Sequence, residues 1–314
     1  IGRGESHLKK SHCNLHATLR QRLKAVRALS KQHRISILCR VLNVNRSTYY
    51  KYVNRQPSHR EQENQQLKKK ILEIYAKTDK RLGFRKMKLC LAQEYCISIS
   101  EGRVYRLMKQ MNLPKMSTAK PPKLKSSAQE TGVCTNLLAQ QFNQPAPNLV
   151  WVCDFTYVRV GARFCYLCVI LDLYARKVIA CRVGKRIDRF LAIDTLRDAV
   201  QLRGVSKGIL FHTDRGSQFT SSDFRKEIDS FHMIQSFSAK GHPFDNAVME
   251  CFFKYLKKEE LNRRHFQSVE QLKQSLVSYI AGFYNPLRPH SHNNGLPPNH
   301  MEDRYFANFS CPLY

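Results

Sequence analysis

Three acidic residues in unlike surroundings are the side chains of this sequence best suited to chemistry. Asp154 lies in the apolar segment VWVCDFTYV, Asp214 follows the apolar segment GILFHT, and Glu250 opens a segment patterned as a helix. Three carboxylates held together repel one another, and bound divalent cations remove that cost. Carboxylate oxygens are the ligands that Mg²⁺ prefers. The pattern predicts a two-Mg²⁺ site for phosphoryl transfer on DNA, in which one ion activates the attacking oxygen and the other stabilises the leaving oxygen.

Each of these acids also has a simpler interpretation. An Asp at the end of a strand often forms a turn, and a Glu near the start of a helix suits the helix dipole. Asp245 rivals Glu250 as a ligand. Asp245 or Asn246 can cap the following helix, and capping explains Asp245 without a catalytic role. Glu250 is therefore preferred as the metal ligand.

The helix that begins near Glu250 carries its charged groups on one face. Glu250, Lys254 and Lys257 follow one another at i, i+4 and i+7. A carboxylate and two ammonium groups on that face can hold a metal ion and a DNA phosphate side by side. The alternative for both lysines is a solvated basic stripe.

Strand-like and helical segments are ordered so that they can position these residues. Three apolar strand-like segments follow one another between residues 149 and 183, and an Ala- and Leu-containing helix is expected at about 189–203. The segment GILFHT then adds a strand that delivers Asp214. Periodicity alone predicts an α/β domain and nothing finer.

The N-terminal third is helical and basic. Leu15, Leu19, Leu23 and Val26 recur at helical spacing, and residues 34–53 read as a helix, a tight turn and a second helix. In a helix-turn-helix unit the second helix enters the major groove, and a small helical bundle is the alternative. The candidate DNA contacts on that helix are Arg46, Ser47, Thr48, Tyr49 and Lys51.

Charge is distributed unevenly along the 314 residues. The formal net charge is +29, and residues 1–148 hold 30 Lys and Arg against 8 Asp and Glu. Such a surplus predicts many phosphate contacts and binding that weakens steeply with salt, with RNA or an acidic membrane surface as alternative partners. No apolar run reaches transmembrane length and no signal segment is evident, so a cytoplasmic protein is expected. A lone CxxC at Cys165 and Cys168 does not make a zinc site.

Four sequence blocks resemble the transposases of the IS-three family of bacterial insertion sequences. The blocks are WVCDFTYV, FHTDRGSQF, SAKGHPFDNAVMECFFKYLKKE and FYNPLRPHSHNNGLPPNH, and the resemblance runs from about residue 33 to about residue 305. It implies an α/β RNase H-like catalytic core with a mixed five-stranded sheet and flanking helices, preceded by all-α helix-turn-helix DNA-binding domains. The implied domains are residues 1–57 and 58–113, a basic linker at 114–146, the core at 147–305 and a tail at 306–314.

The resemblance also assigns roles to residues. It implies that Asp154, Asp214 and Glu250 are the catalytic and metal-binding triad, with Lys257 as the basic residue after the Glu. A second helix-turn-helix adds Arg85 with a helix face formed by Arg103, Arg106 and Lys109. The expected supporting residues are His212, Asn246 and His290. His290 either contacts DNA or locks the domain through a buried hydrogen bond, and the second is favoured.

The sheet expected from the resemblance also indicates the role of Asp172, another candidate metal ligand. Strands that alternate in direction place Asp172, at the end of the second strand-like segment, at the opposite end of the sheet from Asp154. We therefore interpret Asp172 as a turn residue.

The implied function is that of a DNA transposase that binds the terminal inverted repeats of its element and cleaves and joins DNA strands. The implied cofactor is Mg²⁺ as two ions, with Mn²⁺ as a substitute. The expected partners are double-stranded DNA, further copies of the chain as a dimer or higher multimer, and an upstream-frame fusion partner, since the chain starts at Ile1. The expected location is the nucleoid of a bacterial cell. A catalytically silent DNA-binding repressor and an RNase H-fold nuclease without joining activity remain as alternatives.

Overall fold

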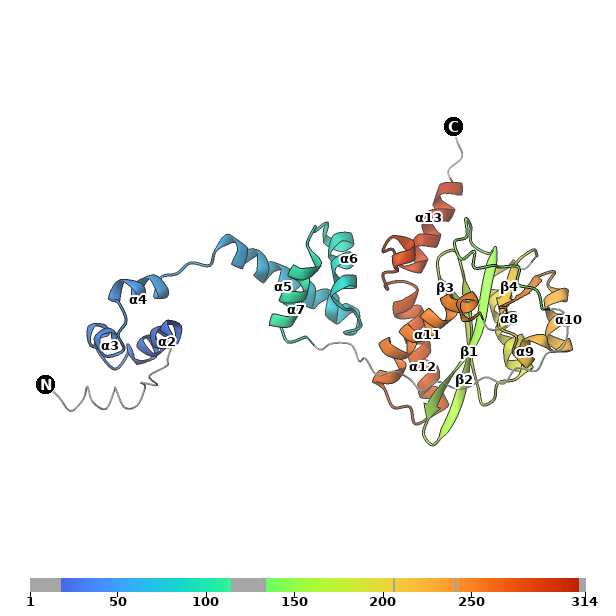
Figure 1. Ribbon diagram of the computed structural model, residues 1–314, viewed down its shortest axis with the longest axis horizontal. Coiled ribbons are helices and arrows are strands. Elements are labelled where there is room, and N and C mark those ends of the chain that lie inside the picture. The colour runs from blue at the N-terminus through green and yellow to red at the C-terminus, as the bar shows by residue number, and fades with distance from the viewer. Residues whose placement is uncertain (1–17, 114–133, 206, 240–241, 311–314) are drawn as a thin grey trace. The chain divides into compact units, whose positions relative to one another are not determined.

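The computed structural model describes residues 18–113, 134–205, 207–239 and 242–310, and the chain divides into two compact units (Figure 1). The first unit ends at Leu67 and the second begins at Lys68, so the division falls inside α5 (His59–Lys77). The predicted boundary at residue 57 lies before this helix. Residues 68–113 share the second unit with the predicted core.

The first unit is a small bundle formed by α2 (Leu19–Leu29), α3 (Ile35–Val41) and α4 (Arg46–Val53). Thr18 and Gln21 form a reciprocal capping box at the start of α2. The turn between α3 and α4 contains Asn43 at φ 48°, a left-handed conformation that Asn tolerates better than most residues. The helices and the turn expected for residues 34–53 are therefore confirmed. Leu15 lies outside the described residues. The core of this unit contains Leu23, Val26, Leu38, Cys39, Leu42, Val44 and Tyr49.

The second unit begins with three helices that precede the sheet. After α5 come α6 (Phe84–Tyr95) and α7 (Glu101–Gln110). Cys96 at φ 54° ends α6 in the left-handed region, and the side chain of Ser100 caps α7 by accepting from the Arg103 amide. The buried side chains Met87, Leu91, Val104 and Leu107 hold α6 and α7 together.

A mixed five-stranded sheet forms the centre of the second unit, as predicted. Its strands are β1 (Val150–Val160), β2 (Arg163–Asp172), β3 (Lys177–Gly184), β4 (Leu210–Thr213) and β5 (Ile234–Phe237). The order across the sheet is β3-β2-β1-β4-β5, and β1 pairs antiparallel with β2 and parallel with β4. The first four strands lie where the apolar segments predicted them. The four-residue β5 was not located from the sequence.

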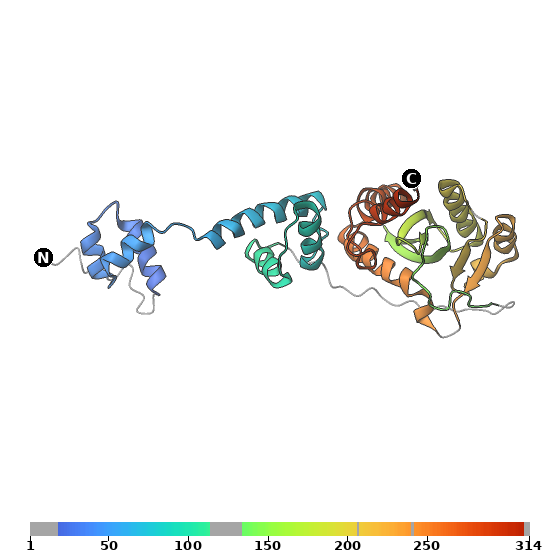
Figure 2. The same ribbon diagram turned by 90° about the horizontal axis from the view of Figure 1, so that it is seen from above.

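Helices cover both faces of the sheet (Figure 2). One face is covered by α8 (Arg189–Arg203), α9 (Ser217–Thr220) and α10 (Ser222–Ser230); the other side carries α11 (Ala247–Glu259), α12 (Val269–Tyr279) and α13 (Pro298–Ser310). Three short 3₁₀ helices, η1 (Pro243–Asn246), η2 (Leu261–Arg263) and η4 (Ser291–Asn293), and the π-helix η3 (Ile280–Tyr284) adjoin these helices along the chain. Trp151 and Cys153 of β1 and Ile170 of β2 pack against α8, so the intervening residues of β1 face α11.

Two predicted boundary segments are structured where they are described. Residues 135–138 of the predicted linker run beside β5, where the Phe237 amide donates to the Thr135 carbonyl. The Leu137 and Leu138 amides both donate to the Ser236 hydroxyl. Residues 114–133 lie outside the described residues. In the predicted tail, α13 continues to Ser310.

Candidate active site

The pairing of β1 with β4 brings Asp154 and Asp214 to the same place on the sheet. Val152 of β1 lies opposite His212 of the parallel strand β4. Asp154 and Asp214 each follow these partners by two residues, so their side chains lie next to each other where β4 ends. Sequence alone put 59 residues between them, and strand register removes that separation.

Asp154 is held in one orientation by two donors. The Phe155 amide donates to Oδ1 at 2.7 Å, and Asn246 Nδ2 donates to Oδ2 at 2.9 Å. Burial, the charge of Asp214 and the charge of Glu250 raise the pKa of Asp154 well above its usual value, and the two donors only partly offset this. A buried carboxyl group in this position favours nearby positive charge.

Asp214 resembles Asp154 in its surroundings. Its Oδ1 accepts from the Gly216 amide at 3.0 Å, and burial raises its pKa. Two adjacent carboxyl groups with raised pKa values carry an electrostatic cost that a bound cation relieves. The pair therefore has the electrostatic character of a cation site.

Helix α11 brings Glu250 and Lys257 to this pair. Glu250 is in the first turn and is exposed, and its charge contributes to the raised pKa of Asp154. Burial lowers the pKa of Lys257, and the negative charge of Asp154 opposes that effect. Lys257 Nζ also lies 4.6 Å from the centre of the Tyr157 ring. Lys254 is exposed on the same helix.

The donor set suits a hard divalent cation. Within the described ranges, no three His, Cys, Asp or Glu side chains lie close enough together to form a metal-ligand cluster. Asp154, Asp214 and Glu250 thus influence one another electrostatically without forming a closed shell of ligands. Their oxygen atoms and the raised pKa values of both aspartates fit Mg²⁺ or Mn²⁺. The buried Asn246 Oδ1 has no hydrogen-bond partner in the described residues, which marks one further oxygen beside the pair.

The predicted cap at the start of α11 is wrong. Asn246 occupies the cap position without a side-chain bond to the helix, because its amide group donates to Asp154 instead. Asp245 is buried and accepts from three donors, which are Asn136 Nδ2, Gln140 Nε2 and the Ala239 amide. These donors occupy both oxygens of Asp245. Asp245 therefore anchors the loop before α11, which weakens it as a rival ligand.

His212, two residues before Asp214 on β4, is fully buried. Its Nδ1 lies 2.9 Å from the Ser236 hydroxyl and its Nε2 lies 3.2 Å from the Ser238 hydroxyl. Burial lowers the pKa of His212 to about 4, so the ring is neutral at pH 7. It supports the site by joining β4 to β5.

His290 lies beside α11. It lines a cavity of about 160 Å³ with Leu171, Arg176, Val248 and Cys251 among the other wall residues. Burial and the nearby arginines lower its pKa to about 3. Its Nδ1 is buried without a partner in the described residues, so the predicted buried hydrogen bond is absent at that atom.

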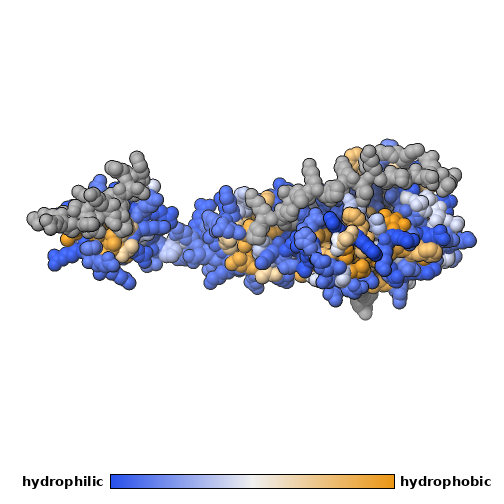
Figure 3. Space-filling view, turned by 90° about the horizontal axis from the view of Figure 1, so that it is seen from below, coloured by the Kyte–Doolittle hydropathy of each residue, from blue (hydrophilic) through white to orange (hydrophobic). Residues whose placement is uncertain are grey.

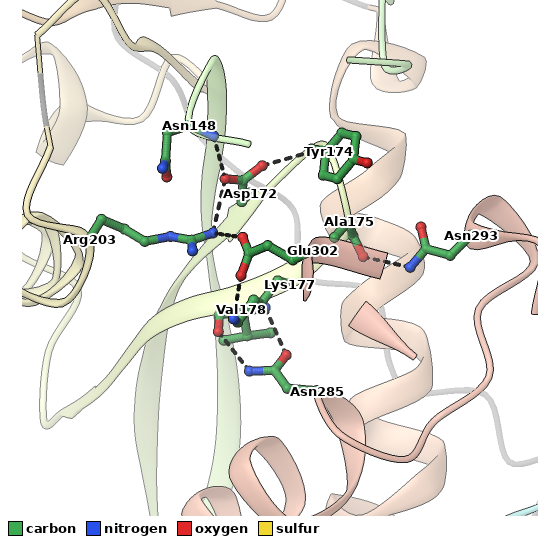
Figure 4. A network of polar contacts seen from close by, with 10 residues as sticks. All are labelled: Asn148, Asp172, Tyr174, Ala175, Lys177, Val178, Arg203, Asn285, Asn293 and Glu302. Carbon is green, nitrogen blue, oxygen red and sulfur yellow. Dashed lines mark hydrogen bonds and ion pairs between the residues drawn. The ribbon is translucent and has the colours of Figure 1, made fainter. Parts of the chain in front are cut away.

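Asp172 is a structural residue, as the sequence indicated. It ends β2 opposite Trp151 and accepts from the amides of Asn148 and Tyr174 and from Arg203 (Figure 4). Arg203 also donates to Glu302 of α13 at 2.6 Å. The same figure shows Asn285 bonded to both backbone groups of Val178 and Asn293 bonded to the Ala175 carbonyl. The C-terminal motif thus fastens the last helices to the β2–β3 turn.

A second buried network, which no local sequence pattern indicated, lies beneath the C-terminal end of α11. Glu259 accepts from Arg288 at 2.7 and 3.0 Å, from Lys86 at 2.8 Å and from the Tyr279 hydroxyl at 2.8 Å. Charged residues in a segment such as YLKKEE usually face solvent, so periodicity did not identify Glu259 as buried. The network fixes the helix that carries Glu250.

The candidate DNA contacts of the first unit differ in how far their side chains are exposed to solvent. Arg46, Ser47 and Lys51 are exposed on α4 and Thr48 is half-buried. The Ser47 hydroxyl and amide both bond to Asn45 Oδ1 at the helix start. Tyr49 is only 4% exposed and packs in the core of the unit, which corrects the prediction that it contacts DNA.

The candidate DNA contacts of the second unit lie mainly at its surface. Arg106 and Lys109 are exposed on α7, and Arg103 is half-buried. Arg85 is exposed on α6 and lies 3.4 Å from Glu101 at the start of α7. Hydrophilic residues cover most of the face that Figure 3 draws, in agreement with the large positive charge.

No helix in the described ranges is long and apolar enough to cross a membrane.

Replacement of Asn246 by Ala tests its contact with Asp154. The change removes a donor that favours the ionised carboxylate, so we expect the Mg²⁺ concentration for half-maximal thermal stabilisation of the protein to rise about 10- to 100-fold. The control is Asn262→Ala, at an exposed position of η2. An unchanged Mg²⁺ requirement in Asn246→Ala would contradict a role in orienting Asp154.

Comparison with protein families and curated proteins agrees with this architecture. Residues 144–243 and 232–298 match the family "Integrase core domain", and residues 61–121 match "HTH-like domain". The chain is 33% identical over 268 residues to "Insertion element IS600 uncharacterized 31 kDa protein" of Shigella sonnei, covering 85% of this chain and 98% of that protein. It is 33% identical over 276 residues to "Transposase InsF for insertion sequence IS3A" of Escherichia coli (strain K12), covering 87% and 95%.

Two similar solved structures are viral. The HTLV-2 integrase catalytic core domain in complex with magnesium (dimeric form) has a TM-score of 0.38 at 20% identity, covering 50% of this chain and 98% of that chain. A simian T-cell lymphotropic virus intasome in complex with PP2A regulatory subunit B56 gamma has a TM-score of 0.39 at 15% identity, covering 68% and 70%.

Proposed function

The chain belongs to the family of transposases of IS3 (IS-three) insertion sequences, and from this membership we propose that it cleaves and joins DNA strands at Asp154, Asp214 and Glu250. It is a DNA transposase with an integrase core and an HTH-like domain. The proposal concerns the reaction that this core performs, its metal ions and its DNA contacts. The observation that carries it is the register of β1 and β4, which sets Asp154 beside Asp214 within the electrostatic reach of Glu250 and Lys257.

In the proposed reaction, water hydrolyses one strand at the end of the element, and the freed 3′ hydroxyl then attacks another phosphodiester in line. Asp154, Asp214 and Glu250 would hold two Mg²⁺ ions, or Mn²⁺ in their place. When bound, these ions supply the positive charge that activates the attacking oxygen and stabilises the leaving oxygen. The contacts of Asp154 with the Phe155 amide and Asn246 keep its carboxylate oriented for that role.

The lysines of α11 are assigned to the DNA. Lys257 lies close enough to Asp154 for their charges to interact, so its ammonium group can hold the phosphate next to the reacting one. Lys254 is exposed one turn earlier and can contact the strand further along. Both contacts position the backbone and carry no sequence information.

We propose that two helical segments, α4 and α6–α7, bind the DNA ends. On α4 we propose contacts from Arg46, Ser47, Thr48 and Lys51, and on α6 and α7 from Arg85, Arg103, Arg106 and Lys109. These segments would read separate parts of a terminal inverted repeat. Because DNA is the proposed substrate, we propose that the protein acts at the nucleoid of a bacterial cell.

Self-association is also part of the proposal, because joining two ends requires two binding units. An apolar groove of about 520 Å³ runs between the edge strand β3 and α12. Leu202 and Val277 line it and are each about two-thirds exposed. A second copy is its proposed occupant.

Strand cleavage and joining on labelled DNA with the element's own ends tests the proposed chemistry. We expect Glu250→Gln to abolish both reactions in Mg²⁺ while DNA binding persists. The matched control is Glu270→Gln, which removes an exposed glutamate from the first turn of α12. Cleavage without joining by the wild type would favour the nuclease alternative. DNA binding without cleavage would favour the repressor, and equal activity of the Glu250 variant would remove that residue from the site.

A further inference from the structure

The C-terminal end of α11 is bonded to the helices that precede the sheet. Its last residue, Glu259, accepts from Lys86 of α6 at 2.8 Å. The next residue, Glu260, accepts from Arg81 through Nη2 at 2.7 Å and through Nε at 3.2 Å. Both carboxylates are at most 1% exposed and Arg81 is 5% exposed. These are buried contacts between segments more than 170 residues apart in the sequence.

The core already supplies each of these carboxylates with a cation of its own. Arg288 forms a bidentate pair with Glu259, and Arg264 lies 2.8 Å from Glu260. The Ser275 hydroxyl also donates to Glu260. Arg81 and Lys86 are therefore not required to neutralise buried charge within the core. What they add is a connection between the core and α6.

Further contacts make the connection reciprocal. Asp79, in the turn between α5 and α6, accepts from Arg263 through its carbonyl at 3.0 Å and lies 3.6 Å from Arg264. The Arg81 guanidinium lies 5.0 Å from the centre of the Phe283 ring. The Lys86 ammonium lies 4.7 Å from the centre of the Tyr255 ring on α11 itself. Polar and aromatic contacts thus fix the start of α6 against the end of α11.

Helix α11 can transmit this attachment to the active site. Glu250 lies nine residues before Glu259, which is roughly 14 Å along a helix. A helix of this length is stiff, so a displacement of its C-terminal turn moves Glu250 and Lys257 with it. Proper alignment of reacting groups is sensitive to shifts of about 1 Å.

We propose that Arg81 and Lys86 are positioning residues for strand cleavage, which lock the DNA-reading segment α6–α7 to α11. A DNA end bound by Arg106 and Lys109 of α7 is then held in a fixed relation to Glu250 and Lys257. The inference rests on the proposed function and adds a route by which end binding and catalysis are aligned. It assigns a role to two basic residues that contact neither DNA nor the reacting atoms.

The test is the double variant Arg81→Gln/Lys86→Gln in the full-length chain. The matched control Lys77→Gln/Lys80→Gln removes the same charge from exposed positions near the same turn. At saturating DNA we expect the single-turnover cleavage rate to fall about 10- to 100-fold in the first variant, while its Kd for the DNA ends matches that of the control. Faster hydrogen exchange in the last turn of α11 should accompany the loss.

Conservative replacement separates positioning from general stability. Arg81→Lys/Lys86→Arg keeps both charges and is expected to restore most of the cleavage rate. If the double Gln variant does not fold, Lys86→Gln alone gives the same comparison, because Glu259 retains Arg288 and Tyr279. A cleavage rate equal to that of the control, or a loss confined to Kd, would overturn the inference. Failure of the proposed function is distinguishable, because the wild type would then not cleave.

Discussion

Asp154→Asn is expected to abolish strand cleavage and joining while it stabilises the metal-free protein. We expect the cleavage rate at saturating DNA to fall by at least about 10³-fold, because removing one of several carboxylates that act together on the reaction removes most of their joint effect. The carboxyl group is buried beside Asp214, and both features raise its pKa. A raised carboxyl pKa means that stability is greatest when the group is protonated and is lost as pH rises through its folded-state pKa. Removal of the charge should therefore raise Tm at pH 7 in EDTA.

Metal binding gives this prediction a second measurement. Mg²⁺ should raise the Tm of the wild type, because a ligand that binds only the folded state stabilises it. That increase should be absent in Asp154→Asn. The chain has a single tryptophan, Trp151, which is fully buried three residues before Asp154, so its fluorescence reports unfolding of this unit. Asp172→Asn is the control: burial raises the pKa of Asp172 too, but its carboxylate contacts Arg203 rather than Asp214, so this variant should keep both the Mg²⁺-dependent rise in Tm and the cleavage activity. A full Mg²⁺ response in Asp154→Asn would exclude that carboxylate as a ligand.

Glu259→Gln is expected to cause the largest loss of stability. The change leaves Arg288 and Lys86 buried against a neutral amide, and breaking a buried ion pair costs about 3 to 5 kcal/mol in the free energy of unfolding. Urea unfolding followed by Trp151 fluorescence measures it. Exposed Glu270→Gln should change the free energy by less than about 0.5 kcal/mol. A similar small change in Glu259→Gln would contradict the structural importance of the network.

The pH dependence of stability should change in the same variant. Burial alone would raise the pKa of Glu259, but the charges of Arg288 and Lys86 outweigh it and lower the pKa from 4.5 to about 2. A lowered carboxyl pKa contributes stability that is present above the unfolded-state value and is lost as pH falls toward the folded-state value. The wild type should therefore lose stability between about pH 4.5 and pH 2, and the Glu259→Gln variant should show a flatter profile there. Equal acid profiles would show that Glu259 is not held ionised.

Local sequence patterns located the regular elements well. The apolar runs that became β1 to β4 are long enough to be recognised, and the helices of residues 34–53 have a clear turn between them. The strand β5 has four residues, too few for periodicity to distinguish it from a loop. Tyr49 was misplaced because a polar-tipped aromatic side chain on a short helix can face either the core or DNA, and only packing against α2 and α3 settles which.

The polar side chains near the site were harder to assign, because their partners are distant in the sequence. Asn246 and Asp245 have the residue types of a helix cap, yet Asp154 competes for the amide of the first and three tertiary donors occupy the second. Glu259 resembles a solvated residue of a charged helix, and its burial depends on Arg288. Local propensity cannot anticipate a partner that arrives only with the fold.

By itself the sequence determined the family, the α/β class of the core, the helical character of the N-terminal third and the three acids to consider, because these depend on local patterns and on residue order. The tertiary structure decided which side chains meet. Parallel pairing of β1 with β4 set Asp154 beside Asp214, and Asn246 turned to Asp154. The α5–α6 turn and α6 were fastened to α11 through Arg81 and Lys86. Such contacts join segments far apart along the chain, so strand register and burial fix them rather than local sequence.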